Sequence, residues 1–226
     1  MKNPKTHTRR RTWFYPPLIL ALAAFIGPVQ AYDSTNYPLD ISDTAEFSRV
    51  WWDKKSGGRY DGAYYKPIAP SGYYILGHYG QGNYHSPRGR VIVVKAIANR
   101  RGSSTALKRP AGYTKIWGDH GSGAKEDGAF WRPIPYPGYK CLGTVATRGY
   151  RQPSRNEIRC VRYDLVVPAK VGGRIWIDKG TGAKTDFGSW YIVPSSSKGI
   201  NSGLFVAHTS HRRPSNRGLY TLKAGQ

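Results

Sequence analysis

Six aspartates in the sequence form three pairs, and the two members of each pair are separated by eight positions that include a glycine-rich run. The pairs are Asp53 and Asp61, Asp119 and Asp127, and Asp178 and Asp186. Carboxylate oxygens are good Ca²⁺ ligands and accept hydrogen bonds from sugar hydroxyls. An Asp side chain can also accept backbone N–H groups and close a tight glycine-containing turn. The spacing predicts three equivalent loops, with a structural turn, a calcium site and a sugar site as competing hypotheses.

An aromatic residue follows the second Asp of each pair by four positions, namely Tyr65, Trp131 and Trp190. A carboxylate beside an aromatic face could grip a sugar ring, so all six aspartates and these three aromatics are candidate ligand-binding residues. A basic residue, Arg59, Lys125 or Lys184, stands between the carboxylates of each pair and disfavours a metal ion. We therefore expect no cofactor, with Ca²⁺ at the Asp loops as the alternative.

The aspartate pairs belong to a longer repeat that opens with a tryptophan two positions before the first Asp. The three tryptophans are Trp51, Trp117 and Trp176, and the copies cover about 50–109, 116–168 and 175–226. Val91–Ile97 and Ile158–Val167 are rich in β-branched residues, and frequent prolines interrupt any helical period. The sequence predicts an all-β fold with a pseudo-threefold repeat of antiparallel sheets. A β-prism-like arrangement fits best, with a β-trefoil or a sandwich as alternatives.

Residues 1–31 have the layout of a secretory signal peptide. A basic start without acidic residues precedes an apolar run from Trp13 to Gly27, and small residues ending at Ala31 offer a cleavage pattern. We expect residues 32–226 to form a single all-β domain that is secreted or periplasmic. An uncleaved N-terminal membrane anchor is the alternative.

The only two cysteines, Cys141 and Cys160, lie in separate strand-like runs on either side of a turn-like segment. An oxidising compartment favours joining them. The sequence predicts a disulfide between two strands, with two buried free thiols as the alternative.

Lysine and arginine number 35 against 13 aspartates and glutamates, which gives a formal net charge of +22. Such a charge attracts the protein to an anionic surface, either a glycan or a lipid. Export makes nucleic acid an unlikely physiological partner. The sequence contains no His-Glu-x-x-His motif, no nucleophile elbow and no isolated cysteine nucleophile. We therefore expect an exported, non-enzymatic β module that binds a cell-surface or extracellular ligand. A secreted membrane-active toxin or effector is the second hypothesis, and a hydrolase with an unrecognised site is the third.

The second repeat carries an extended motif over Ile116–Gly143, in which Trp117, Asp119 and Asp127 precede Trp-Arg-Pro and Gly-Tyr elements. This motif resembles the vacuolar protein sorting-associated protein 62 family. Trp51–Gly77 is similar, whereas the third copy lacks the Arg-Pro and Gly-Tyr elements. The resemblance carries with it no activity, cofactor or catalytic residues.

Overall fold

A computed structural model describes residues 37–98 and 105–224 of the chain. The predicted signal peptide, residues 1–31, lies outside the described residues. The described residues form strands, joined by turns and one 3₁₀ turn, η1 (Tyr163–Leu165). Within them, no helix is both long enough and apolar enough to traverse a lipid bilayer.

The strands fall into three successive units. The first unit contains β1 (Leu39–Thr44), β2 (Phe47–Trp52), β3 (Ala63–Pro67), β4 (Tyr74–Ile75), β5 (Tyr79–Gln81) and β6 (Val91–Ala96). The second contains β7 (Leu107–Lys108), β8 (Gly112–Gly118), β9 (Gly128–Ile134), β10 (Tyr139–Lys140), β11 (Val145–Arg148) and β12 (Cys160–Arg162). The third contains β13 (Val166–Ile177), β14 (Gly188–Pro194), β15 (Phe205–His208) and β16 (Tyr220–Leu222).

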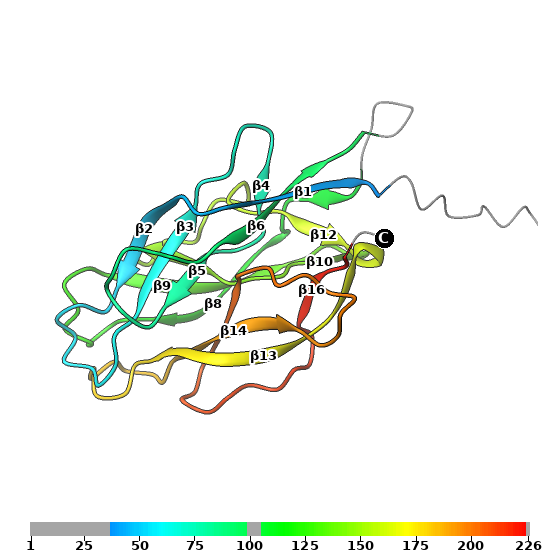
Figure 1. The fold of residues 1–226 in the computed structure, drawn as a ribbon. Coiled ribbons are helices and arrows are strands. Elements are labelled where there is room, and N and C mark those ends of the chain that lie inside the picture. The colour runs from blue at the N-terminus through cyan, green and yellow to red at the C-terminus, as the bar shows by residue number, and fades with distance from the viewer. Residues whose placement is uncertain (1–36, 99–104, 225–226) are drawn as a thin grey trace, which may run out of the picture. The chain divides into compact units, whose positions relative to one another are not determined.

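The same antiparallel pairing recurs in each unit. The opening strand pairs with the closing strand, as β1–β6, β7–β12 and the first part of β13 with β16. The next segment forms a hairpin, as β2–β3, β8–β9 and the rest of β13 with β14, and a third strand, β5, β11 or β15, completes that sheet. This repetition confirms the predicted all-β, pseudo-threefold fold and is consistent with a β-prism-like architecture (Figure 1).

Each unit opens ten to twelve residues before its tryptophan, with β1, β7 or the start of β13. The expected copies start later, near residues 50, 116 and 175. The reason for the difference is that the opening strands share little sequence, whereas the tryptophan hairpins share a motif.

A β-bulge precedes the tryptophan in every unit. The register shifts lie between Arg49 and Trp51, Lys115 and Trp117, and Arg174 and Trp176. A bulge bends its strand and redirects the following side chain. The three indoles meet edge to face, with ring centroids 5.5 to 5.8 Å apart, and each is at most 2% exposed.

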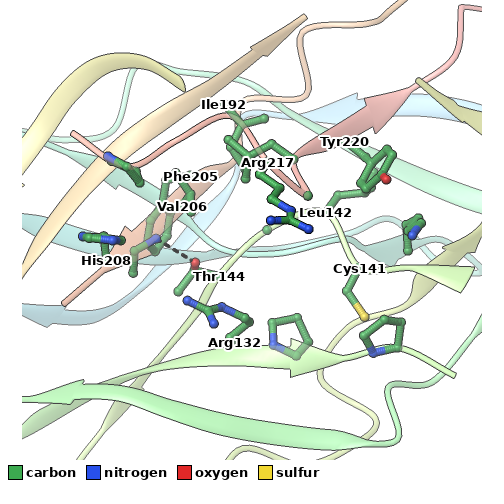
Figure 2. Close-up of a pocket in the computed structure, with 18 of the residues that line it drawn as sticks. Arg132, Cys141, Leu142, Thr144, Ile192, Phe205, Val206, His208, Arg217 and Tyr220 are labelled. Atoms are coloured by element: carbon green, nitrogen blue, oxygen red, sulfur yellow. Dashed lines mark hydrogen bonds between the residues drawn. The ribbon is translucent and has the colours of Figure 1, made fainter. Parts of the chain in front are cut away.

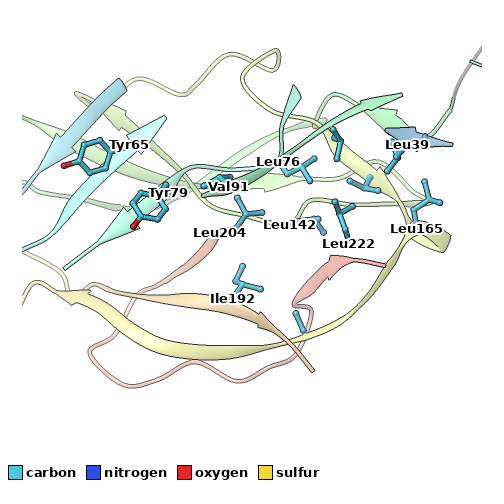
Figure 3. Close-up of a cluster of buried hydrophobic side chains, with 14 of the residues drawn as sticks. Leu39, Tyr65, Leu76, Tyr79, Val91, Leu142, Leu165, Ile192, Leu204 and Leu222 are labelled. Carbon is cyan, nitrogen blue, oxygen red and sulfur yellow. The ribbon is translucent and has the colours of Figure 1, made fainter. Parts of the chain in front are cut away.

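Two main clusters of buried side chains join the units. The indoles pack with Tyr64, Phe130, Phe187 and Phe205 in an aromatic cluster. A second cluster draws aliphatic side chains from all three units, including Leu76, Leu142 and Leu204 (Figure 3). Burial of each such side chain contributes about 1.5–3 kcal/mol, and because both clusters draw on all three units, this contribution depends on the units being packed together.

The predicted disulfide is confirmed. Cys160 on β12 is bonded to Cys141, which directly follows β10, its neighbour in the same sheet.

Candidate functional site

The segments 53–61, 119–127 and 178–186, here called the Asp loops, connect the two strands of each tryptophan hairpin and lie together (Figure 1). Each loop donates one backbone N–H to a carbonyl of another loop, and the three bonds close a ring. The N···O distances are 3.0 Å for Arg59 to Lys179, 2.9 Å for Lys125 to Lys54, and 3.1 Å for Lys184 to His120. The ring fixes the three loops relative to one another.

The three tryptophans also hold the Asp loops in place through hydrogen bonds. Each indole Nε1 donates to a carbonyl in the Asp loop of a different unit: Trp51 to Glu126 (2.6 Å), Trp117 to Thr185 (2.7 Å) and Trp176 to Tyr60 (2.8 Å). Every unit therefore supports a neighbour's loop through its own core residue.

The first Asp of each pair ties its loop together from inside. The carboxylate of Asp53 accepts hydrogen bonds from the Gly62 N–H (2.8 Å), the Ser56 hydroxyl (3.2 Å) and the Tyr84 hydroxyl (2.7 Å). Burial raises the pKa of Asp53 despite these bonds. Trp176 Nε1 of the third unit also donates to Asp53 (3.1 Å), and the residue is only 2% exposed, so internal donors use the whole carboxylate.

Asp119 repeats this arrangement. It accepts from the Gly128 N–H (3.0 Å), the Ser122 hydroxyl (3.4 Å) and the Tyr150 hydroxyl (2.8 Å). Burial, followed by the hydrogen bond to Asp119, raises the pKa of Tyr150, so the phenol stays protonated as the donor.

The third loop has different donors around its carboxylate: His211 stands in place of the tyrosine, Thr181 in place of the serine and Phe187 in place of the glycine. Asp178 accepts from the Phe187 N–H (2.9 Å) and from His211 Nε2 (2.6 Å), and Asp186 lies 3.7 Å from the same nitrogen. Ligand atoms of Asp178, Asp186 and His211 all lie within 4.8 Å of one another. Within residues 37–98 and 105–224, this is the group whose side chains could hold a metal, although Ca²⁺ prefers an all-oxygen set. Calcium at the Asp loops stays a prediction.

The second Asp of each pair is exposed, in contrast to the first. Asp61, Asp127 and Asp186 lie at the solvent-facing side of the loops, accompanied by exposed basic side chains. These are Lys54, Lys55, Arg59, Lys125, Lys179 and Lys184. Within residues 37–98 and 105–224, none of these six is recorded in an ion pair. The ring therefore presents six cations around three carboxylates.

The predicted aromatic partners lie in the interior. Tyr65, Trp131 and Trp190 are only 3 to 6% exposed. Tyr65 packs on Phe47, and Trp131 donates its Nε1 hydrogen to the Thr147 hydroxyl (2.9 Å). Of the nine candidate residues, the structure brings Asp61, Asp127 and Asp186 to the surface and places the other six inside.

Sequence reasoning missed the residues that complete the loops, Tyr84, Tyr150 and His211. They follow the first Asp of their units by 31, 31 and 33 positions. That near-constant spacing indicates three equivalent residues in the sequence, but the change from tyrosine to histidine in the third unit makes it hard to recognise.

The sequence and the fold of the chain can be compared with those of known proteins. No curated protein matches the sequence. Among solved structures, the crystal structure of GNIP1Aa from Chromobacterium piscinae is similar, with a TM-score of 0.71 and 29% identity. The match covers 83% of this chain but 37% of that chain, so the chain corresponds to a part of the longer protein. The model of the vacuolar protein sorting-associated protein 62 family matches residues 36–226, which include all three tryptophan hairpins and their Asp loops. The chain belongs to the vacuolar protein sorting-associated protein 62 family.

Proposed function

We propose that the protein is an exported, non-enzymatic binding module that uses its three Asp loops to hold an anionic glycan at a cell surface or in the extracellular space. The observation that carries the proposal is the charge of the ring. Six exposed cations without recorded ion partners surround three exposed carboxylates, Asp61, Asp127 and Asp186. The carboxylates accept from sugar hydroxyls and the cations pair with sulfate or carboxylate groups.

The rigidity of the ring supports a binding role. The loops are fixed by backbone hydrogen bonds to one another and by the indoles below, so a ligand does not have to order them. Three similar contact sites on one surface also raise the affinity for a polymer, because the second and third contacts form at high effective concentration.

The choice of a glycan over a lipid surface rests on the lack of apolar anchors. Among the described loop residues, Tyr60 is the one large apolar side chain with substantial exposure, at 39%. Helices and loops that anchor in a membrane interface place several apolar residues there. An anionic lipid surface is the second candidate, which the net charge of +22 favours.

Non-enzymatic binding is proposed because the buried carboxylates of the loops are sealed from solvent. The carboxylate oxygens of Asp53 and Asp178 accept hydrogen bonds from internal donors, and burial raises the pKa of both groups. The similarity to part of a longer chain fits a module that can be joined to other domains.

The test removes one cation from each loop. Arg59→Ala, Lys125→Ala and Lys184→Ala are combined, because the backbone N–H groups of these residues, not their side chains, close the ring. Binding to immobilised heparin is expected to weaken about 10- to 100-fold, at about 0.5–1 kcal/mol for each lost contact. The matched control combines Lys95→Ala, Lys170→Ala and Lys198→Ala, which removes the same charge from exposed positions elsewhere.

Three outcomes contradict the proposal. Equal weakening in both triple variants means that net charge alone attracts the glycan. Retention of heparin binding by the loop variant, or binding and leakage of anionic phospholipid vesicles without heparin binding, assigns the loops another function.

A further inference from the structure

A cavity of about 460 Å³ lies between the second and third units, away from the Asp loops (Figure 2). Its lining includes Arg132 on β9, Lys140 on β10 and Arg217 in the segment before β16. No aspartate or glutamate lines it. Small-molecule sites have volumes of about 300–1,000 Å³, so the space suits a small ligand.

The corresponding boundary between the first and second units is closed by a charge network. Glu157 Oε1 lies 2.9 Å from Lys66 Nζ and 3.1 Å from His78 Nε2. His78 Nδ1 accepts the Ala146 N–H (3.2 Å), so its Nε2 carries the hydrogen and donates to Glu157. Although burial acts to raise it, the bonds from His78 and Lys66 lower the Glu157 pKa to about 2. The carboxylate is therefore charged and compensates Lys66.

Each member of this network has an equivalent in the cavity. Arg132 holds the hairpin position of Lys66, since Thr114–Arg132 corresponds to Ser48–Lys66 in the strand register. Thr144 replaces His78, because its Oγ1 accepts the Ala207 N–H (3.0 Å) as His78 Nδ1 accepts that of Ala146.

Gly218 replaces Glu157. Arg162 N–H donates to Ala106 O as Lys223 N–H donates to Leu165 O, and Cys160 pairs with Lys108 as Thr221 pairs with Val167. Glu157 and Gly218 both lie five residues before these donors, so they hold the same position. Arg132, Thr144 and Gly218 all line the cavity. The second boundary therefore has a cation, Arg132, but no carboxylate, and the hydroxyl of Thr144 stands in place of the imidazole.

The remaining polar groups of the lining add to the excess of positive charge over negative charge. In the described part of the chain, no carboxylate is recorded in an ion pair with Arg132, Lys140 or Arg217. The Lys140 ammonium lies 4.8 Å from the centroid of the Tyr220 ring, and His208 has a buried Nδ1 without a hydrogen-bond partner. Figure 2 shows the Arg132 and Arg217 side chains reaching toward the same space.

We propose that this cavity binds the oxyanion group of a small ligand, a sulfate, phosphate or carboxylate, which occupies the place that the Glu157 carboxylate holds at the neighbouring boundary. The planar guanidinium of Arg132 can bind such a group through two parallel N–H donors, which a lysine cannot do. The site is independent of the glycan surface proposed above, because it shares no residue with the Asp loops.

The experiment follows the Arg132 and Arg217 side-chain Nε–Hε signals by NMR while sodium sulfate replaces sodium chloride at constant ionic strength. We expect saturable shifts of both signals. Glycerol phosphate and glucuronate are titrated in the same way, and the tightest of the three anions identifies the group that the cavity prefers.

Gly218→Glu supplies the missing carboxylate at a position where its equivalent pairs with a cation. We expect at least a tenfold loss of sulfate affinity, whereas Gly218→Gln, which has the same shape and the same backbone strain at φ +77° without the charge, retains most of it. Arg132→Gln is expected to lose at least tenfold as well, and it covers the case in which the Gly218 variants do not fold. The loop variant with Arg59→Ala, Lys125→Ala and Lys184→Ala is expected to bind sulfate as the unmodified chain does.

Three results overturn the inference. They are the absence of saturable shifts with all three anions, equal losses in Gly218→Glu and Gly218→Gln, and unchanged affinity in Arg132→Gln. Because the loop variant reports on the ring separately, failure of the cavity and failure of the glycan surface can be distinguished.

Discussion

At the scale of single residues, the two aspartates of each pair have different surroundings although their types and spacing are the same. Asp119 is 4% exposed and holds three donors, whereas Asp127 is exposed beside Lys125. The environment created by the fold, and not the residue type, separates a structural carboxylate from one available to a ligand.

This division predicts that changing Asp119 to alanine lowers the stability much more than changing Asp127 does. Asp119→Ala leaves the Gly128 N–H and the Ser122 and Tyr150 hydroxyls without their acceptor and is expected to lower the free energy of unfolding by about 2–4 kcal/mol. Asp127→Ala is expected to cost about 1 kcal/mol or less. Urea denaturation measures both, and equal losses would contradict the division.

The backbone of the first loop predicts a stabilising substitution. Lys55 has φ of +72°, at the position where the other loops have Gly121 (+84°) and Gly180 (+89°). A side chain in this left-handed region costs about 1–2 kcal/mol relative to glycine. Lys55→Gly is expected to raise the free energy of unfolding by about 0.5–1 kcal/mol after the entropy cost of glycine. Lys55→Ala is the control, and a gain as large as that of glycine would disprove the strain.

At the scale of elements, the three units share strand pairing but differ where they meet. The network of Lys66, Glu157 and His78 joins the first two units, and an open cavity stands at the next boundary. The two boundaries therefore differ in the residues that meet there, although the strand pairing on either side is the same.

The network predicts an acid-dependent loss of stability. The Glu157 pKa is about 2 in the folded protein against 4.5 for an ordinary glutamate, so its contribution is complete above pH 4.5 and disappears as the pH falls to 2. Glu157→Gln is expected to remove the part of the pH dependence that falls in this window and to lower stability above it by about 1–3 kcal/mol. Unfolding free energies measured from pH 7 to pH 2 test this, and parallel curves for the two proteins would refute it.

The elements also show what the sequence could predict. The hairpin motif with Trp117 and Asp119 was sufficient for the all-β repeat, and the position of Cys141 and Cys160 in two strand-like runs was sufficient for the disulfide. The spacing of Tyr65, Trp131 and Trp190 did not decide between an inward ring and a ligand-binding ring, because a ring at the same spacing can face either side of a strand, and the structure places all three inside. The cavity was not predictable either, since Gly218 and Thr144 become comparable with Glu157 and His78 only through the strand register and the hydrogen bonds between units.

At the scale of the whole described chain, the units are connected cyclically. Each tryptophan supports a loop of another unit, and each loop donates a hydrogen bond to another. A local substitution in one loop therefore acts on a shared surface, and the binding strength of that surface is a property of all three units together.

The most direct test of this account is to measure the dissociation constant for a sulfated heparin oligosaccharide as Arg59, Lys125 and Lys184 are changed to alanine in one, two and then all three loops. The account predicts a stepwise loss of about two- to fivefold for each loop, whichever loop is changed first, because each contact contributes about 0.5–1 kcal/mol. An affinity that does not change, or one that depends on a single loop, would contradict a ring in which three equivalent loops bind one anionic polymer.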